Sequence, residues 1–90
     1  MRLIFSGDAQ EDLSFWITQN DRNALRKIFA LIEDIQCNGL LHGIGQPERL
    51  SYRKEAEYSR RINHSDRLVY CLDKSGDLVI LSCRGHYDDK

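Results

Sequence analysis

Residues 58–87 are YSRRINHSDRLVYCLDKSGDLVILSCRGHY, and they set the architecture of the whole chain. Tyr, Ile, Val and Leu gather in three runs, at 58–63, 67–72 and 78–84, as is typical of strands. Polar turns separate the runs at 64–66 and 73–77, where Gly76 can adopt a positive φ. Short turns join antiparallel neighbours, so the pattern predicts a three-stranded antiparallel meander.

The expected register divides the meander into two faces. If the first turn spans 64–66, Asn63 lies opposite Arg67 and Arg61 lies opposite Val69. Opposed residues in an antiparallel pair point to the same face. The expected core face of the first two strands consists of Tyr58, Ile62, Leu68, Tyr70 and Leu72, with Arg60 as the one misfit.

The third strand extends both faces by its alternation. Its expected core residues are Val79, Leu81 and Cys83. The other face is expected to be open to solvent and to carry Arg61, Arg67, Arg84 and His86.

Two helices are expected before the meander, to cover its core face. Residues 2–5 predict a short edge strand, and Ser6 is a typical N-cap. The first helix has an apolar stripe of Ala9, Leu13, Trp16 and Ile17. Asp21 caps a second helix that ends near Gly39 and whose apolar positions are Leu25, Ile28, Phe29, Ile32 and Ile35. An αα-hairpin packed on a sheet is an α+β fold.

The segment at 40–47 holds Gly43, Gly45 and the only proline of the chain. This composition predicts a loop that brings Glu48 and Arg49 to the edge of the sheet. Loops on rigid scaffolds often carry functional residues.

Composition limits the class of protein. Ninety residues predict one domain, 1–90, and 41% hydrophobic with 30% charged residues is ordinary for a globular protein. No segment is expected to span a membrane or to act as a signal sequence. Cys37, Cys71 and Cys83 form no CxxC pair, which predicts buried free thiols in a reducing compartment, the cytoplasm.

The charge pattern and the histidines bear on partners. A net charge of −1 argues against coating nucleic acid by bulk electrostatics, although residues 49–67 hold six basic and three acidic side chains. His42, His64 and His86 lack metal-ligand spacing, so no metal or other cofactor is expected.

Four motifs together resemble the YoeB/Txe branch of the RelE toxin superfamily. They are Gly45-Gln46-Pro47-Glu48, Ser59-Arg60-Arg61-Ile62, Asp66-Arg67-Leu68-Val69-Tyr70 and Cys83-Arg84-Gly85-His86-Tyr87. The resemblance covers essentially the whole chain. It implies a microbial-ribonuclease-like fold, and a bacterial toxin that enters the ribosomal A site and cuts messenger RNA.

The resemblance also implies roles for individual residues. Glu48, Arg67, His86 and Tyr87 match the family's functional positions, and Arg61 matches a phosphate contact. Metal-free RNA cleavage needs a base, an acid and donors to the phosphate, which Glu48, His86 and the arginines can supply. Tyr87 can stack on or orient a nucleotide. The implied partners are a cognate antitoxin, the ribosome with its message, and a second copy of the toxin in a homodimer.

The sequence departs from the family at several positions. Ser51 stands where relatives have lysine, and Arg49 is expected to supply that charge to the RNA. Gly85 replaces an aromatic residue, and residues 88–90 add an acidic tail.

Other readings of these residues stay open. Glu48 alone could be a solvated loop acid, and Arg60 and Arg61 could form ion pairs with Glu55 or Glu57. The protein could instead inhibit DNA gyrase without cutting RNA, or be an inactive member that binds an antitoxin and co-represses its operon.

Overall fold

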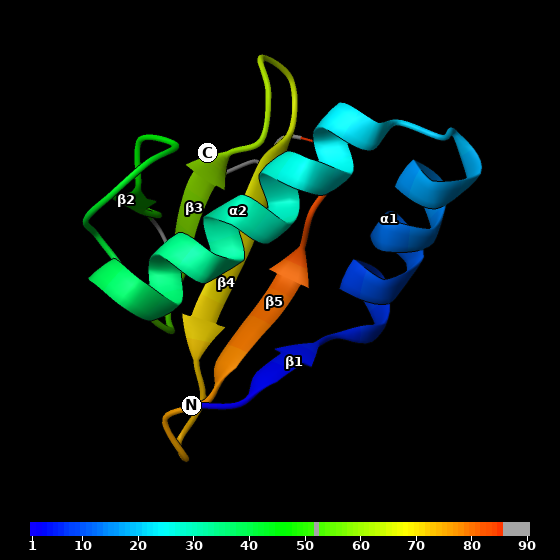
Figure 1. The fold of residues 1–90 in the computed structure, drawn as a ribbon. Coiled ribbons are helices and arrows are strands. Elements are labelled where there is room, and N and C mark those ends of the chain that lie inside the picture. Colours follow the sequence, from blue (N-terminus) through cyan, green and yellow to red (C-terminus); the bar gives the residue numbers. More distant parts are fainter. Residues whose placement is uncertain (52, 86–90) are drawn as a thin grey trace.

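The structure, a computed structural model, describes residues 1–51 and 53–85 of the chain. The elements in chain order are β1 (Leu3–Phe5), α1 (Gly7–Thr18), α2 (Arg22–Asn38), β2 (Glu48–Arg49), β3 (Tyr58–Arg61), β4 (Arg67–Leu72) and β5 (Leu78–Ser82). The strands form one mixed sheet in the order β1-β5-β4-β3-β2. α2 crosses one face of this sheet, and α1 lies beside it toward the β1 edge (Figure 1). The predicted α+β architecture is confirmed.

Capping side chains begin both helices where the sequence predicts. The Ser6 hydroxyl accepts a hydrogen bond from the Ala9 amide, and the Asp21 carboxylate accepts one from the Ala24 amide. These bonds satisfy amide groups that have no partner within the helix. α2 ends at Gly39, whose φ of 94° suits glycine.

The predicted helix stripes are correct except at two positions. Ile17 is 60% exposed and Phe29 is 47% exposed, whereas Leu31, which the predicted stripe omits, is fully buried. At about 100° per residue, Ile17 lies about 80° around the helix from Ala9, and Phe29 about 100° from Ile28. Trp16 is buried as predicted, and its indole N–H donates to the Cys83 carbonyl at 2.8 Å.

The antiparallel meander is confirmed, with a different register between β3 and β4. Arg61 lies opposite Arg67 and Ser59 opposite Val69, a shift of two residues from the prediction. The turn is longer than expected because the Asn63 side chain accepts hydrogen bonds from the amides of Ser65 and Asp66. A shift of two leaves every side chain on its predicted face.

The predicted core face of β5 is wrong. Leu78 and Ile80 are fully buried, while Val79 and Leu81 are only partly covered. A bulge interrupts the β4–β5 ladder, so Tyr70 pairs with Ile80 but Val69 pairs with Ser82. The extra residue breaks strict alternation, and Cys83 is therefore buried as well, as predicted.

β1 pairs with β5 in parallel, which joins the two ends of the chain. The Ser6 amide donates to the Ile80 carbonyl, and the Leu78 amide donates to the Arg2 carbonyl, both at 2.9 Å. Asp77 accepts hydrogen bonds from the backbone and side chain of Arg2, and these lower the pKa of the Asp77 carboxyl. One edge of the sheet is therefore built from β1 and β5, which lie far apart in the sequence.

The three cysteines are free thiols with unequal exposure. Cys83 is buried as predicted, Cys71 is partly buried, and Cys37 is exposed, contrary to prediction. Burial raises the pKa of the Cys83 thiol to about 12, so this side chain is a neutral core residue.

Neither helix within residues 1–51 and 53–85 has the length and apolarity needed to cross a membrane.

Candidate functional site

Three predicted site residues share one face of the sheet at its β2 end. Glu48 in β2 lies opposite Ser59 in β3, and Arg61 in β3 lies opposite Arg67 in β4. Because opposed and alternate residues point to the same side, Glu48, Arg61 and Arg67 lie on one face. Glu48 is about 7 Å along the strands and about 10 Å across them from Arg67, within the combined reach of the two side chains.

This face is less open than predicted. Ser59 is only 1% exposed and Val69 only 6%, so the centre of the face is covered. Glu48 and Arg61 are exposed at its rim, and Arg67 is partly buried. The accessible charged groups therefore lie beside a covered centre and not on an open face.

The guanidinium of Arg67 is held in place by the turn before β4. Its Nη1 atom donates to the carbonyls of Asn63, His64 and Asp66 at 3.3, 3.4 and 3.2 Å. Among the described residues, all the hydrogen bonds of this guanidinium are made by Nη1, and Nε and Nη2 make none. An arginine oriented in this way is suited to a phosphate group.

The chain that follows β5 is fixed beside Arg67. The Gly85 amide donates to the Asp66 carboxylate at 2.6 Å, and the Gly85 carbonyl accepts from the Arg67 amide at 3.0 Å. Two residues earlier, the Cys83 amide donates to the Asp12 carboxylate of α1 at 3.0 Å. The described chain therefore stops next to Arg67. The predicted site residues His86 and Tyr87 come next in sequence and lie outside the described residues.

Arg84 does not share the face with Arg61 and Arg67, contrary to prediction. Its guanidinium carbon lies 3.5 Å from the centre of the Phe15 ring of α1, in a cation–π contact. The Phe15 ring also makes an edge-to-face contact with Trp16. Arg84 therefore packs against α1, and its place is set by the Phe15 ring and not by the alternation of β5.

Arg49 follows Glu48 in β2, and its side chain lies on the opposite face of the sheet. It lies opposite Tyr58, on the face where the Tyr58 and Tyr70 rings stack 5.8 Å apart. As a neighbour of Glu48 on an exposed edge strand, Arg49 lies at the rim of the sheet.

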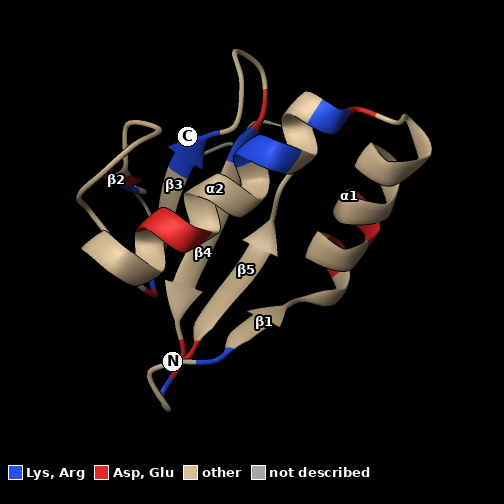
Figure 2. Cartoon of the chain, viewed as in Figure 1, with Lys and Arg blue, Asp and Glu red and all other residues tan. Residues whose placement is uncertain are grey.

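Basic groups are concentrated near Arg61. Lys and Arg colour the first half of α2 and the end of β3, whereas Asp and Glu colour α1 (Figure 2). A surface hollow of about 440 Å³ beside Arg61 is lined in part by Lys27, Asn63 and His64. Of the six basic residues at 49–67, only Arg61 lines this hollow, whereas Arg60 is buried and Arg49 lies on the other face of the sheet.

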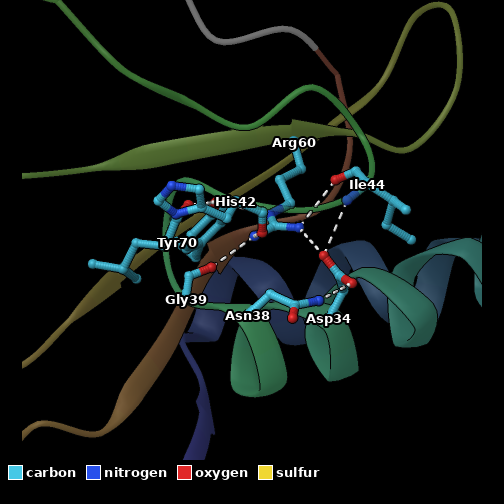
Figure 3. Close-up of polar contacts among 8 residues, drawn as sticks. Asp34, Asn38, Gly39, His42, Ile44, Arg60 and Tyr70 are labelled. Carbon is cyan, nitrogen blue, oxygen red and sulfur yellow. Dashed lines mark hydrogen bonds and ion pairs between the residues drawn. The ribbon is translucent and has the colours of Figure 1, made fainter.

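Arg60 is the polar residue whose role the sequence does not reveal. Its side chain is fully buried on the core face, where the sequence places it as the one charged residue among apolar ones. Its Nη1 atom pairs with the Asp34 carboxylate at 2.5 Å (Figure 3). For Arg60, the alternative of a pair with Glu55 or Glu57 is wrong, since its ion-pair partner is Asp34 and Glu57 pairs with Arg53 at 3.6 Å. The only sequence signal for this pair is a charged residue in a core register.

The pair makes stability depend on pH. The hydrogen bond from Arg60 lowers the pKa of the Asp34 carboxyl, and the Ile44 amide and Asn38 side chain add to this effect. A carboxyl whose pKa is lower in the folded state stabilises the protein above its unfolded pKa of about 3.9 and loses that contribution below it.

We therefore expect Asp34→Asn to destabilise the protein most at neutral pH. Its free energy of unfolding should approach that of the wild type as the pH falls from 5 to 2, because the wild type loses the ionised carboxylate in that range. Urea unfolding at several pH values measures this. Glu33→Gln, an exposed neighbour on α2, is the control. A destabilisation by Asp34→Asn that does not change with pH would contradict the expectation.

Metal-ligand clusters are absent from the part of the chain that the structure describes, where no three His, Cys, Asp or Glu side chains are grouped to hold an ion.

Comparisons with known proteins agree on one family. The profile of the YoeB-like toxin of bacterial type II toxin–antitoxin systems matches residues 5–87. A YoeB toxin from Synechocystis is 40% identical over 87 residues, which cover 97% of this chain and 98% of that protein. The YoeB dimer from Staphylococcus aureus superposes with a TM-score of 0.87 at 44% identity, covering 97% of this chain and 98% of that one. YoeB in the heterotetrameric YoeB–YefM toxin–antitoxin complex from the same organism gives a TM-score of 0.83 at 44% identity and the same coverage.

Proposed function

Because the chain belongs to the YoeB family of toxins of bacterial type II toxin–antitoxin systems, we propose that it is an endoribonuclease that cuts messenger RNA in the ribosomal A site. The observation that carries the proposal is the strand register that gathers Glu48, Arg61 and Arg67 on one face. A carboxylate and two guanidinium groups around one substrate position suit transfer at a phosphodiester.

The proposed reaction is an internal transphosphorylation. Glu48 accepts the proton of the 2′-hydroxyl, the 2′-oxygen forms a bond to phosphorus, and the bond to the 5′-oxygen breaks. His86 donates a proton to that leaving oxygen. Arg67 and Arg61 donate to the phosphate oxygens as charge develops on them, and Tyr87 stacks on or orients a nucleotide. The products are a 2′,3′-cyclic phosphate and a 5′-hydroxyl, and the step itself uses no metal ion.

The position of Gly85 supports the assignment of the acid. Its two hydrogen bonds to Asp66 and Arg67 fix the backbone immediately before His86 beside the proposed phosphate site. The acid would thus enter the site from the end of β5, while Glu48 enters from β2 across the face. An acid and a base on opposite sides of the phosphate are what the transfer needs.

The proposed partners follow from the same premises. With a net charge of −1, the protein alone should bind messenger RNA weakly, and contacts with the ribosome should position it on the message. The proposed activity takes place in the cytoplasm. S. aureus YoeB is found as a dimer and in complex with YefM, and we propose a homodimer and a cognate antitoxin for this chain. An antitoxin segment that folds over the face of Glu48, Arg61 and Arg67 would block RNA entry.

Primer-extension mapping in a reconstituted bacterial translation reaction tests the function. We expect cuts at the A-site codon of the translated message, far slower cleavage of the same message without ribosomes, and fragments with a 5′-hydroxyl. Equal rates on naked and ribosome-bound message would contradict the ribosome dependence. If no cuts occur but translation or gyrase activity is inhibited, the protein is a binding inhibitor and not a nuclease.

A further inference from the structure

Backbone carbonyl groups from residues 39–44 surround the guanidinium of Arg60. The side chain is completely buried, and all three of its nitrogen atoms donate hydrogen bonds. Nη2 donates to the carbonyls of Gly39 and His42, both at 2.8 Å, and Nη1 donates to the carbonyl of Ile44 at 3.0 Å. Three carbonyls and the carboxylate of Asp34 thus surround one cation, as Figure 3 shows.

Two neighbours of Arg60 hold the same loop. The Tyr70 hydroxyl accepts from Arg60 Nε at 3.0 Å and donates to the Leu40 carbonyl at 2.6 Å. The Asp34 carboxylate accepts from the Ile44 amide at 3.0 Å. Backbone groups of four loop residues between 39 and 44 are therefore tied to a single buried cluster.

The loop also packs too closely to shift freely. A Cβ atom at Gly43 would lie 1.7 Å from a carboxylate oxygen of Asp34, and one at Gly45 would lie 2.6 Å from a methyl group of Leu31. Both glycines have positive φ, of 122° and 82°. The loop follows one path because its backbone lies directly on α2 and β3.

This loop leads to Glu48. The Gly45 carbonyl accepts from the Arg61 amide at 2.7 Å, and Glu48 pairs with Ser59. Arg60 stands between Ser59 and Arg61 in β3, so the cluster lies under the segment of β3 that receives both ends of residues 45–48. The side chains of Arg60 and Arg61 point to opposite faces, one toward the loop and one toward the site.

We propose that Arg60, with Tyr70 and Asp34, is a positioning residue that sets the location of Glu48 relative to Arg61 and Arg67. The inference rests on the proposed function, because it assigns the cluster to the placement of the base in that reaction. A displacement of about 1 Å in a reacting group can slow a reaction by about 100-fold. The cluster therefore acts through Glu48 and does not touch RNA.

Tyr70→Phe tests the proposal with the loss of a single hydroxyl group. The ring and its stacking on Tyr58 remain, but the links to Arg60 and Leu40 are removed. Ser6→Ala is the matched control at the opposite edge of the sheet. The Ser6 hydroxyl also donates one hydrogen bond, to the Leu81 carbonyl, and accepts one, from the Ala9 amide.

We expect Tyr70→Phe to slow single-turnover cleavage of ribosome-bound message by about 10- to 100-fold while affinity for the ribosome stays unchanged. Ser6→Ala should stay near the wild-type rate although both variants lose two hydrogen bonds and some thermal stability. In a Glu48→Gln background, Tyr70→Phe should slow the residual reaction no further, because the base that it displaces is already gone.

Three outcomes overturn the proposal in distinguishable ways. Equal rates for Tyr70→Phe and Ser6→Ala would show that the cluster does not position the site. An equal loss from Tyr70→Phe in the wild-type and Glu48→Gln backgrounds would show that the effect does not pass through Glu48. Absence of cleavage by the wild type would remove the proposed function and, with it, the role assigned to Arg60.

Discussion

Replacing Arg60 with methionine is expected to lower the Tm by about 15 °C or more. The change removes the buried guanidinium, which hydrogen-bonds to α2, to β4 and to the loop after α2. Methionine can fill much of the space but donates no hydrogen bond. Removing one partner of a buried, hydrogen-bonded ion pair costs about 3–5 kcal/mol. For a domain whose total stability is about 5–15 kcal/mol, the loss is a large fraction.

Arg61→Met is the matched control for this prediction. Arg61 is the next residue of β3, it carries the same side chain, and it is exposed on the other face. Substitutions at exposed positions usually change the free energy of unfolding by about 0.5 kcal/mol or less. Thermal and urea unfolding of the two variants measure the difference. Equal losses at the two positions would mean that the Arg60 contacts contribute little to stability.

Glu48→Gln is expected to slow cleavage of ribosome-bound message by about 100- to 10,000-fold, the range typical for loss of a general base. Glutamine keeps the size of the side chain and its ability to accept a hydrogen bond but cannot take the 2′-hydroxyl proton. Because Glu48 is exposed on an edge strand, the fold should tolerate the change. The Tm and the affinity for the ribosome should stay close to those of the wild type.

Single-turnover cleavage with toxin in excess separates this chemical effect from binding. Glu33→Gln, the same exchange at an exposed site on α2, is expected to cut at the wild-type rate. A Glu48→Gln protein as fast as the wild type would exclude Glu48 as the base. The proposed acid can be examined in the same assay with His86→Gln, whose loss should fall in the same range.

The sequence predicted the helices, the meander and one face of the sheet because these follow from local rules. Ser6 and Asp21 cap helices through bonds to residues three positions away. The β3–β4 register was displaced by two residues, yet Arg61 and Arg67 stayed on their predicted face because strands alternate with a period of two.

The errors arise where distant parts of the chain decide the outcome. The bulge beside Val69 and the packing of α1 on β5 set which β5 residues are buried, and neither leaves a local signal. Arg84 was placed by extrapolating that alternation, and its contact with Phe15 lies 69 positions away in sequence. The partners of Arg60 are mainly backbone carbonyls, to which residue identity gives no guide.

The parallel pairing of β1 with β5 also governs when the protein can finish folding during its own synthesis. β1 and α1 are made long before the groups that complete them. The Leu81 carbonyl is 75 positions after the Ser6 hydroxyl, and the Cys83 carbonyl is 67 positions after the Trp16 indole. Contacts between such distant residues form late and slowly. A nascent chain therefore carries an unfinished sheet for as long as its last strand is still inside the ribosome.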